Sequence, residues 1–525
     1  RGQPQFSSSR SCRILSEHTV PRAAGQRPPT AAAPGRRNGM VLLIVLTLQT
    51  MLILDVNVVN IALPDLKVAL DFTPTGLSWV LSSYLLTFGG LLLLGGRAGD
   101  VLGHRRGLLV GVTIFTAASL LGGLSNSAAM LLVARALQGV GAAFAAPTVL
   151  ALIATHFTDE KARAKALGMY AAVSGSGAAI GLIGGGLLTD WLSWRWVLFI
   201  NVPIGIVLLI AAPMFIHETE RKPARFDLAG ALTSTLGMTA LVYGFIRAAD
   251  SGWSDALTLA SFAAALVLLV AFVFVENNAK QPITPLRLFA DRNRATGYLS
   301  LLFVMAAGNS MFFFLTQFLQ EVRGFTPIQA GLAFVPLAVL ILATSSIAAK
   351  ILPKAGPRVL TAVGAAAISV GLIWFAQLTP EATFVSAMLG PMLVAGLGMG
   401  TLLVGVTTIL MSGIAPEETG AASGLLNVMQ QIGGALGLAI MVTVFGAASR
   451  GAADEVPAGL DAKGAADFVL TEGVTTAFAW GAGFTALTIL LTLIMRSVPM
   501  GGGAEQGADD APEQSPSPAQ HVTSL

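Results

Sequence analysis

Long apolar runs, separated by short polar or charged segments, repeat along most of the chain. Between residues 39 and 497 we count fourteen such runs, each long enough for an α-helix to cross the hydrocarbon core of a membrane, which takes roughly 20 residues. Strand-type alternation is absent, and a helix in lipid satisfies its own backbone hydrogen bonds. The pattern predicts helices near residues 39–62, 77–97, 107–125, 128–154, 167–189, 196–216, 228–249, 256–275, 297–320, 327–349, 358–378, 383–411, 420–447 and 472–496.

Composition supports this interpretation and excludes an ordinary soluble protein. Hydrophobic residues make up 54% of the chain and charged residues only 11%, with a mean hydropathy of +0.74. Such values are far outside the soluble globular range. The net charge of +3 does not indicate nucleic-acid binding, because the basic residues fall in short loops between the runs. We therefore predict an all-α membrane protein with 14 transmembrane helices.

The Lys and Arg residues are unevenly divided between the loops on the two sides of the predicted membrane. About sixteen lie in one alternating set of loops and about six in the other. Loops rich in Lys and Arg remain on the cytoplasmic side. With an even number of spans, both termini are then expected to be cytoplasmic, in a multi-pass protein of the inner (cytoplasmic) membrane.

An internal repeat divides the chain into two similar parts. The acidic pairs Asp159-Glu160 and Glu417-Glu418 are 258 residues apart, and each lies between two Gly-rich spans. Parallel repeats of this kind are typical of transporters built from two related bundles. We expect a disordered cytoplasmic tail at 1–38, a six-helix bundle at 39–216, two inserted helices with flanking cytoplasmic loops at 217–296, a second six-helix bundle at 297–497 and a disordered cytoplasmic tail at 498–525.

Two charged residues lie inside apolar spans. Asp55 is about 16 residues into the first span, roughly 24 Å from the cytoplasmic face at 1.5 Å per residue, and Arg135 is roughly 10 Å below the outer face of a core about 30 Å thick. An ionisable residue at such a depth suggests function. Because the depths are similar, the two groups can pair, and protonation of Asp55 would release the pair. A purely structural ion pair is the alternative.

The loop between the second and third spans combines glycines with charges. Gly96 and Gly103 suit a tight cytoplasmic turn, and Asp100 can pair with Arg105 and Arg106 to form a conformational latch between neighbouring helices. A solvated basic loop that serves only topology is the alternative. In the fifth span, Gly177, Gly181, Gly185 and Gly186 allow a neighbouring helix to approach closely, which is also common in generic membrane packing.

Several of these segments resemble one known family. The 96–106 loop resembles the signature loop of the major facilitator superfamily, and residues 132–143 resemble its second motif. Residues 175–186 are similar to its antiporter signature, with Leu182 where proline is usual. Together with 54–64, 77–86 and 194–205, they look like the fourteen-span drug:proton antiporter branch. The resemblance covers residues 39–497.

The resemblance implies a proton-coupled antiporter that exports drugs, antibiotics or amphipathic secondary metabolites by alternating access between two six-helix bundles. It assigns proton response to Asp55, with Arg135 as the partner that tunes it. The substrate-pocket candidates are polar residues of the spans: Tyr84, Gln138, Asn309, Gln317 and Gln430. Amides and aromatic rings suit bulky amphipathic ligands. For the phenylalanines near Asn309, packing in the core or against lipid is the alternative.

Other functions leave little trace in the sequence. Cys12 is the only cysteine, and the five histidines lie in tails and loops without metal-ligand spacing, so we predict no metal. We also predict no cofactor, with the proton gradient as energy source, and a monomer. A transporter of one metabolite, either a dedicated exporter or an uptake symporter, is the first alternative. A membrane-embedded enzyme would need a motif such as Walker A or HExxH, which is absent, and a receptor or scaffold would have larger soluble loops.

Overall fold

The computed structural model describes residue 2 and residues 34–157, 159–218, 227–279, 286–414 and 419–496. The predicted tails at 1–38 and 498–525 lie almost wholly outside the described residues, as does the Glu417-Glu418 pair. Within the described ranges every regular element is a helix. Thirteen of these helices are long and apolar enough to cross a membrane, and a bent helix, α6 (Glu160–Trp191), is a fourteenth, with an angle of 44° between its two segments. The predicted all-α membrane fold is confirmed.

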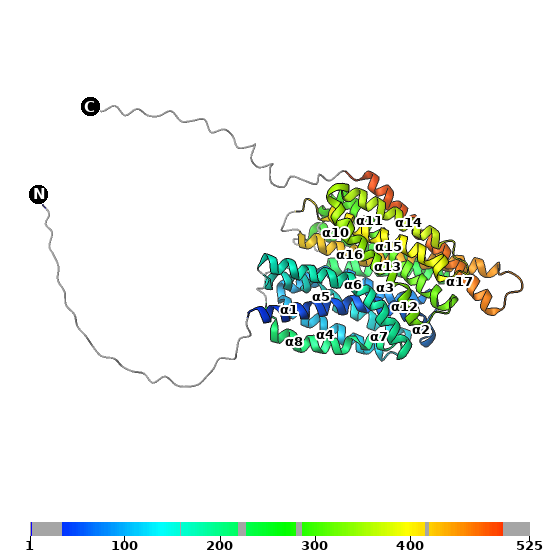
Figure 1. Cartoon of the computed structure of the whole chain (residues 1–525), viewed down its shortest axis with the longest axis horizontal. Helices are drawn as coiled ribbons and strands as arrows, with labels where there is room; N and C mark the ends of the chain where they lie inside the picture. The colour runs from blue at the N-terminus through cyan, green and yellow to red at the C-terminus, as the bar shows by residue number, and fades with distance from the viewer. Residues whose placement is uncertain are drawn as a thin grey trace, which may run out of the picture.

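The first half of the chain forms one group of packed helices, drawn in blue to green in Figure 1. Its long members are α1 (Pro34–Ile61), α3 (Trp79–Leu102), α4 (His104–Gly123), α5 (Ala128–His156), α6 and α8 (Asn201–Phe215), with the short helices α2 (Leu63–Ala69), η1 (Gly76–Ser78) and α7 (Trp196–Phe199) in their connections. Local chemistry sets several boundaries: Ser127 caps α5 and Asp159 caps α6, each through its side-chain oxygen.

The second half forms a second group. Its long members are α11 (Arg292–Gln317), α13 (Val335–Ala355), α14 (Pro357–Phe375), α15 (Leu389–Met411), α16 (Thr419–Asp454) and α17 (Ala462–Ile494), joined by η2 (Leu286–Phe289), η3 (Phe318–Val322), α12 (Pro327–Ala333) and η4 (Phe384–Met388). A capping box formed by Thr326 and Gln329 starts α12.

A pair of glycine contacts shows that the two halves repeat the same packing. A Cβ atom at Gly141 of α5 would lie 2.8 Å from the carbonyl oxygen of Gly111 of α4, and one at Gly364 of α14 would lie 2.7 Å from that of Gly398 of α15. Gly141 and Gly398 are 257 residues apart, close to the offset that the acidic pairs predict. Corresponding helices therefore cross at glycines in nearly corresponding positions, since 253 residues separate Gly111 from Gly364, and only a residue without a side chain allows this approach.

Helices α9 (Leu228–Ser251) and α10 (Ala256–Asn278) lie between the two halves in sequence, and α9 packs against both α3 and α16. Thr443 of α16 donates a hydrogen bond to the Phe245 carbonyl (2.6 Å), and the Trp79 and Tyr243 rings are 6.1 Å apart. The insertion thus bridges the two halves on one side.

An ion pair closes the turn between α9 and α10. Arg247 Nε lies 2.6 Å from an Asp255 carboxylate oxygen, and Asp255 also caps α10 by accepting from the Thr258 backbone N–H. The Arg247 hydrogen bond, with the smaller contribution of Thr258, lowers the pKa of Asp255 to about 2. The carboxylate is therefore charged throughout the neutral pH range.

The long helices give the molecule two ends. We call the end where α1 begins the terminus end, and the end with the turn between α16 and α17, which projects from the body in Figure 1, the hairpin end. At the hairpin end the two halves meet: Lys67 Nζ lies 2.7 Å from Glu321 Oε2, and Gln320 donates to the Ile61 carbonyl at 2.8 Å.

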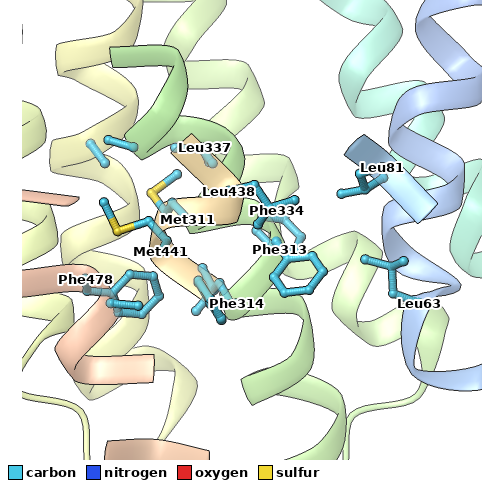
Figure 2. Close-up of a cluster of buried hydrophobic side chains, with 14 of the residues drawn as sticks. Leu63, Leu81, Met311, Phe313, Phe314, Phe334, Leu337, Leu438, Met441 and Phe478 are labelled. Atoms are coloured by element: carbon cyan, nitrogen blue, oxygen red, sulfur yellow. The ribbon is translucent and has the colours of Figure 1, made fainter. Parts of the chain in front are cut away.

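An apolar cluster continues this contact inward. Leu63 and Leu81 of the first half and Phe313, Phe314 and Phe334 of the second belong to one buried cluster, and Figure 2 shows the two leucines facing the Phe313 and Phe334 rings. The phenylalanines at 313 and 314 are 1% exposed, so core packing accounts for them.

Candidate functional site

Asp55 and Arg135 meet inside the first helix group, as their similar predicted depths allow. Asp55 is 1% exposed and Arg135 is fully buried, and Arg135 Nη1 lies 2.5 Å from Asp55 Oδ2. The other carboxylate oxygen, Oδ1, accepts from Gln138 Nε2 and from Asn201 Nδ2, each at 2.9 Å. Three donors from α5 and α8 therefore hold one carboxylate, which is the condition under which a buried charge is tolerated.

The guanidinium of Arg135 is held on several sides. Its Nε donates to the Val80 carbonyl of α3 at 3.0 Å, and Nη1 also donates to Gln138 Oε1 at 2.9 Å. The Tyr84 ring lies under the guanidinium carbon, 4.5 Å from it, in a cation–π contact. These contacts fix the orientation of Arg135 independently of Asp55.

Gln138 links the ion pair to α4. Its Nε2 donates to Ser119 Oγ at 2.8 Å, and Ser119 Oγ donates in turn to the Phe115 carbonyl at 2.7 Å. We call Asp55, Arg135, Gln138, Asn201 and Ser119 the polar cluster. It joins α1, α4, α5 and α8 in one hydrogen-bonded unit. A change in the charge of Asp55 would therefore alter hydrogen bonds that link all four helices.

The second half has no equivalent of the polar cluster at the repeated positions. Met392 and Ala395 lie 257 residues after Arg135 and Gln138, and both are buried in an apolar core. The repeat in helix packing therefore does not extend to the chemistry. Among the residues of the second half that the structure describes, none of the buried side chains is charged.

The glycines of α6 bring that helix against α1, which carries Asp55. A Cβ atom at Gly177 would lie 2.7 Å from Ile53, one at Gly181 would lie 2.8 Å from Asn57 Cβ, and one at Gly185 would lie 2.8 Å from Val58 Cα. Gly186 has a different partner: its Cβ would lie 2.7 Å from Ile328 Cα of α12, in the second half. One glycine-rich helix thus contacts both the segment around Asp55 and the interface between the halves.

The charges of the 96–106 loop pair differently from the prediction. Arg105 Nε and Arg106 Nε lie 3.8 and 3.6 Å from Glu218 Oε2, whereas Asp100 lies 3.7 Å from His104 Nε2. Gly103, with φ of +99°, separates α3 from α4, so both arginines fall in the first turn of α4 and face the end of α8.

Only one of the two glycines predicted for the turn lies in it. A Cβ atom at Gly103 would overlap Glu218 Oε1, whereas Gly96 lies inside α3, where a Cβ atom would be in ordinary contact with Pro147 at 3.7 Å. Sequence reasoning missed Glu218 because it is more than a hundred residues from the loop; its only signal is an acidic residue directly after an apolar span.

The five pocket candidates divide into two sets. Tyr84, Gln138 and Gln317 are at most 2% exposed, and the first two belong to or stack on the polar cluster. Asn309 and Gln430 are half-buried. Asn309 donates to the Met305 carbonyl of its own helix at 3.2 Å. A role in binding substrate remains a prediction for all five.

Sequence reasoning also missed Asn201 and Ser119. Asn201 could have been found, because it is a polar residue in an apolar run next to the aromatic segment 194–199. Ser119 gives no such signal, since serine is common in transmembrane helices and bonds its own backbone. Among the residues that the structure describes, no group of three His, Cys, Asp or Glu side chains could hold a metal ion.

Twelve of the fourteen membrane-length helices form two repeated groups, α9 and α10 lie between them in sequence, and the first group holds a buried ion pair. This architecture is that of a secondary transporter. The chain belongs to the Major Facilitator Superfamily, whose model matches residues 45–438. This confirms the resemblance that the motifs indicated.

Individual proteins are similar over most of the chain. Puromycin resistance protein pur8 of Streptomyces alboniger is 38% identical over 467 residues, covering 88% of this chain and 92% of that protein. Cephamycin export protein CmcT of Amycolatopsis lactamdurans is 38% identical, covering 88% and 94%. Multidrug resistance protein Stp of Mycobacterium tuberculosis is 32% identical, covering 76% and 74%. A bacterial homologue of the human lysosomal transporter Spinster, solved in an inward-facing and occupied conformation, has the same fold, with a TM-score of 0.64, 18% identity and coverage of 88% and 97%.

Proposed function

We propose that this chain is a proton-coupled antiporter that exports drugs, antibiotics or amphipathic secondary metabolites across the cytoplasmic membrane. Similarity to proteins named for puromycin resistance and cephamycin export supports the substrate class. The buried Asp55–Arg135 pair carries the proposal of proton coupling, because an intramembrane carboxylate is the group that such a transporter needs to bind a proton. The proton gradient is the energy source.

The charge of the loops supports an orientation with both termini in the cytoplasm, so that the hairpin end faces outward. In this orientation the contacts of Lys67 with Glu321 and of Gln320 with Ile61 close the outer side. When the outer side opens, Asp55 receives a proton from outside and loses the negative charge that Arg135 pairs with. When the inner side opens, the proton leaves to the cytoplasm, and the pair forms again.

Protonation would change the packing of α1 against α5 and α8, because the polar cluster spans these helices. Helix α1 also packs against α6, and α6 meets the second half at Gly186. A contiguous set of contacts thus connects the carboxylate to the interface between the halves. This connection is how binding of a proton and movement of the halves would be coupled.

Transport in inverted membrane vesicles tests this function. The vesicles come from a host that lacks its own efflux pumps, and puromycin is the probe substrate. We expect Asp55→Asn to lower uptake driven by an imposed pH gradient at least about tenfold, which corresponds to a rise of about 1.4 kcal/mol or more in the activation free energy of transport. Puromycin exchange without a gradient should persist. Asp71→Asn is the matched control, since Asp71 is exposed, has φ of 54°, and asparagine tolerates that conformation.

Gradient-driven uptake by Asp55→Asn at the wild-type rate would contradict the role of Asp55 in proton coupling. Transport of puromycin, lincomycin and cephamycin by the wild-type chain would indicate a multidrug exporter. Transport of one of them alone would favour a dedicated exporter, the function that the name of the cephamycin relative suggests.

A further inference from the structure

The side-chain amide of Asn201 uses its donor but not its acceptor in the polar cluster. Asn201 is the first residue of α8 and is 1% exposed. Its Nδ2 donates to Asp55 Oδ1 at 2.9 Å, but its Oδ1 is buried and accepts no hydrogen bond from any residue that the structure describes. An unused buried acceptor costs free energy, so its presence beside an ionisable group calls for a functional explanation.

The other donors to Asp55 have fixed hydrogen-bond directions. Gln138 Oε1 accepts from Arg135, and Gln138 Nε2 donates to Ser119, whose hydroxyl donates to the Phe115 carbonyl. Turning the Gln138 amide would break these bonds. Arg135 has only donors and cannot accept.

In the present arrangement, none of the three hydrogen-bond partners of Asp55 offers an acceptor for the new O–H group of a protonated Asp55. Turning the Asn201 amide by about 180° exchanges its N–H and C=O groups in space. This rotation would break one hydrogen bond, from Asn201 Nδ2 to Asp55 Oδ1. A new hydrogen bond, from the protonated carboxyl group to Asn201 Oδ1, would replace it. Asn201 is the hydrogen-bond partner that can donate to the Asp55 carboxylate and accept from the protonated carboxyl group without breaking other bonds of the polar cluster.

We infer that Asn201 is the switching residue of the polar cluster: its amide donates to the Asp55 carboxylate and turns to accept from the protonated carboxyl group. The inference rests on the proposed proton coupling and deepens it. No covalent bond changes except that a proton from water binds an Asp55 oxygen, and O–H···O replaces N–H···O. The charged and titratable groups facing Asp55 are Arg135 from α5 and Tyr84 from α3; among the described residues α4 and α8 contribute only the uncharged Ser119 and Asn201, and α6 packs through its glycines.

Infrared difference spectroscopy tests the switch directly. The full chain, in lipid nanodiscs and with ¹³C in the asparagine side-chain carbonyl, is compared with unlabelled protein, each as a low-pH minus high-pH spectrum. We expect a carboxyl band that is absent in Asp55→Asn, together with an asparagine carbonyl band that moves to lower frequency because Oδ1 becomes hydrogen-bonded. The asparagine band should disappear in Asn201→Leu and in Asn201→Thr. It should persist in Tyr84→Phe, which removes a buried hydroxyl that has no hydrogen-bond partner among the described residues.

The outcomes separate the switch from proton coupling itself. An Asp55 carboxyl band without the asparagine shift, or a shift that remains in Asn201→Leu and Asn201→Thr, overturns the switch and leaves proton coupling intact. Loss of the shift in Tyr84→Phe also overturns it, because the tyrosine hydroxyl would then take part. Absence of any Asp55 carboxyl band refutes both proposals.

Transport supplies a second measurement. A hydroxyl group can also donate or accept, so Asn201→Thr should keep proton-driven puromycin uptake within about threefold of wild type, whereas Asn201→Leu should lower it at least about tenfold. If Asn201→Leu is poorly folded, the loss of the labelled band in Asn201→Thr still assigns the signal. Equal rates for the leucine variant and the wild type contradict the switch.

Discussion

At the scale of single residues, the buried ion pair gains its stability from the groups around it. Removing one partner of such a pair typically costs about 3–5 kcal/mol, because the other charge is left buried. Arg135 avoids complete dependence on Asp55, since it also bonds the Val80 carbonyl and Gln138 and lies over Tyr84. The arginine can therefore stay in place when the carboxylate loses its charge, and this is what a reversible proton site needs.

Replacing Arg135 with lysine tests this arrangement. Lysine keeps the charge but has a single nitrogen and no planar face, so it cannot bond Asp55, Gln138 and the Val80 carbonyl together while stacking on a ring. We expect Arg135→Lys to lower gradient-driven uptake about tenfold or more and to reduce the thermal stability of the purified protein. Arg292→Lys, at an exposed position at the start of α11, is the control. An unchanged uptake rate in Arg135→Lys would show that charge alone matters.

At the scale of elements, α6 is the helix whose glycines have separate tasks. Gly177, Gly181 and Gly185 contact α1, and Gly186 contacts α12 across the interface between the halves, whereas Gly184 has no atom near its would-be Cβ. The spacing of the glycines predicts close packing but does not say which neighbour each one meets. That depends on how α6 is rotated about its axis.

This difference predicts a contrast between two neighbouring alanine variants. In Gly186→Ala the added methyl would lie 2.7 Å from the Ile328 Cα and the Pro327 carbonyl oxygen, so α6 and α12 must separate. We expect it to shift the molecules toward a conformation open at the hairpin end, seen as a longer distance between spin labels on α6 and α12. Gly184→Ala should leave the distance unchanged and slightly stabilise the helix, by roughly 1 kcal/mol or less. Equal distance distributions in the two variants would refute the assignment.

At the scale of the whole molecule, the two halves are joined at the hairpin end, by direct packing of α3 against α16 and of α6 against α12 and α13, and through α9. The hairpin-end contact combines an apolar cluster with the Lys67–Glu321 ion pair, whose side chains are 23% and 24% exposed. Helix α9 adds contacts to both α3 and α16. A transporter must break the first set of contacts in each cycle, so that set has to be weak enough to open.

We therefore predict that the Lys67–Glu321 pair tunes the conformational equilibrium. Because a partly exposed ion pair contributes at most about 1 kcal/mol, Glu321→Gln should raise the population open at the hairpin end by up to about fivefold. The exchange of charges in Lys67→Glu with Glu321→Lys should restore the original population. Spin-label distances between α2 and α12 measure both. A double variant as open as Glu321→Gln would show that the pair itself does not hold the halves together.

The sequence by itself determined the class of the protein, because fourteen long apolar runs have no stable alternative to helices in a membrane. It also indicated two of the buried charges: Asp55 and Arg135 interrupt apolar runs at similar depths, which allows them to pair. The division into two similar halves could be seen in the repeated acidic pairs.

The tertiary structure alone decided which side chains complete the site. Asn201 and Ser119 join Asp55 and Arg135 only because α4 and α8 are rotated to present them. Glu218 pairs with both arginines of the 96–106 loop because α8 ends beside the start of α4. Helix rotation and neighbour choice are set by the packing of residues far apart in the chain. Hydropathy and motif spacing contain no information on that packing.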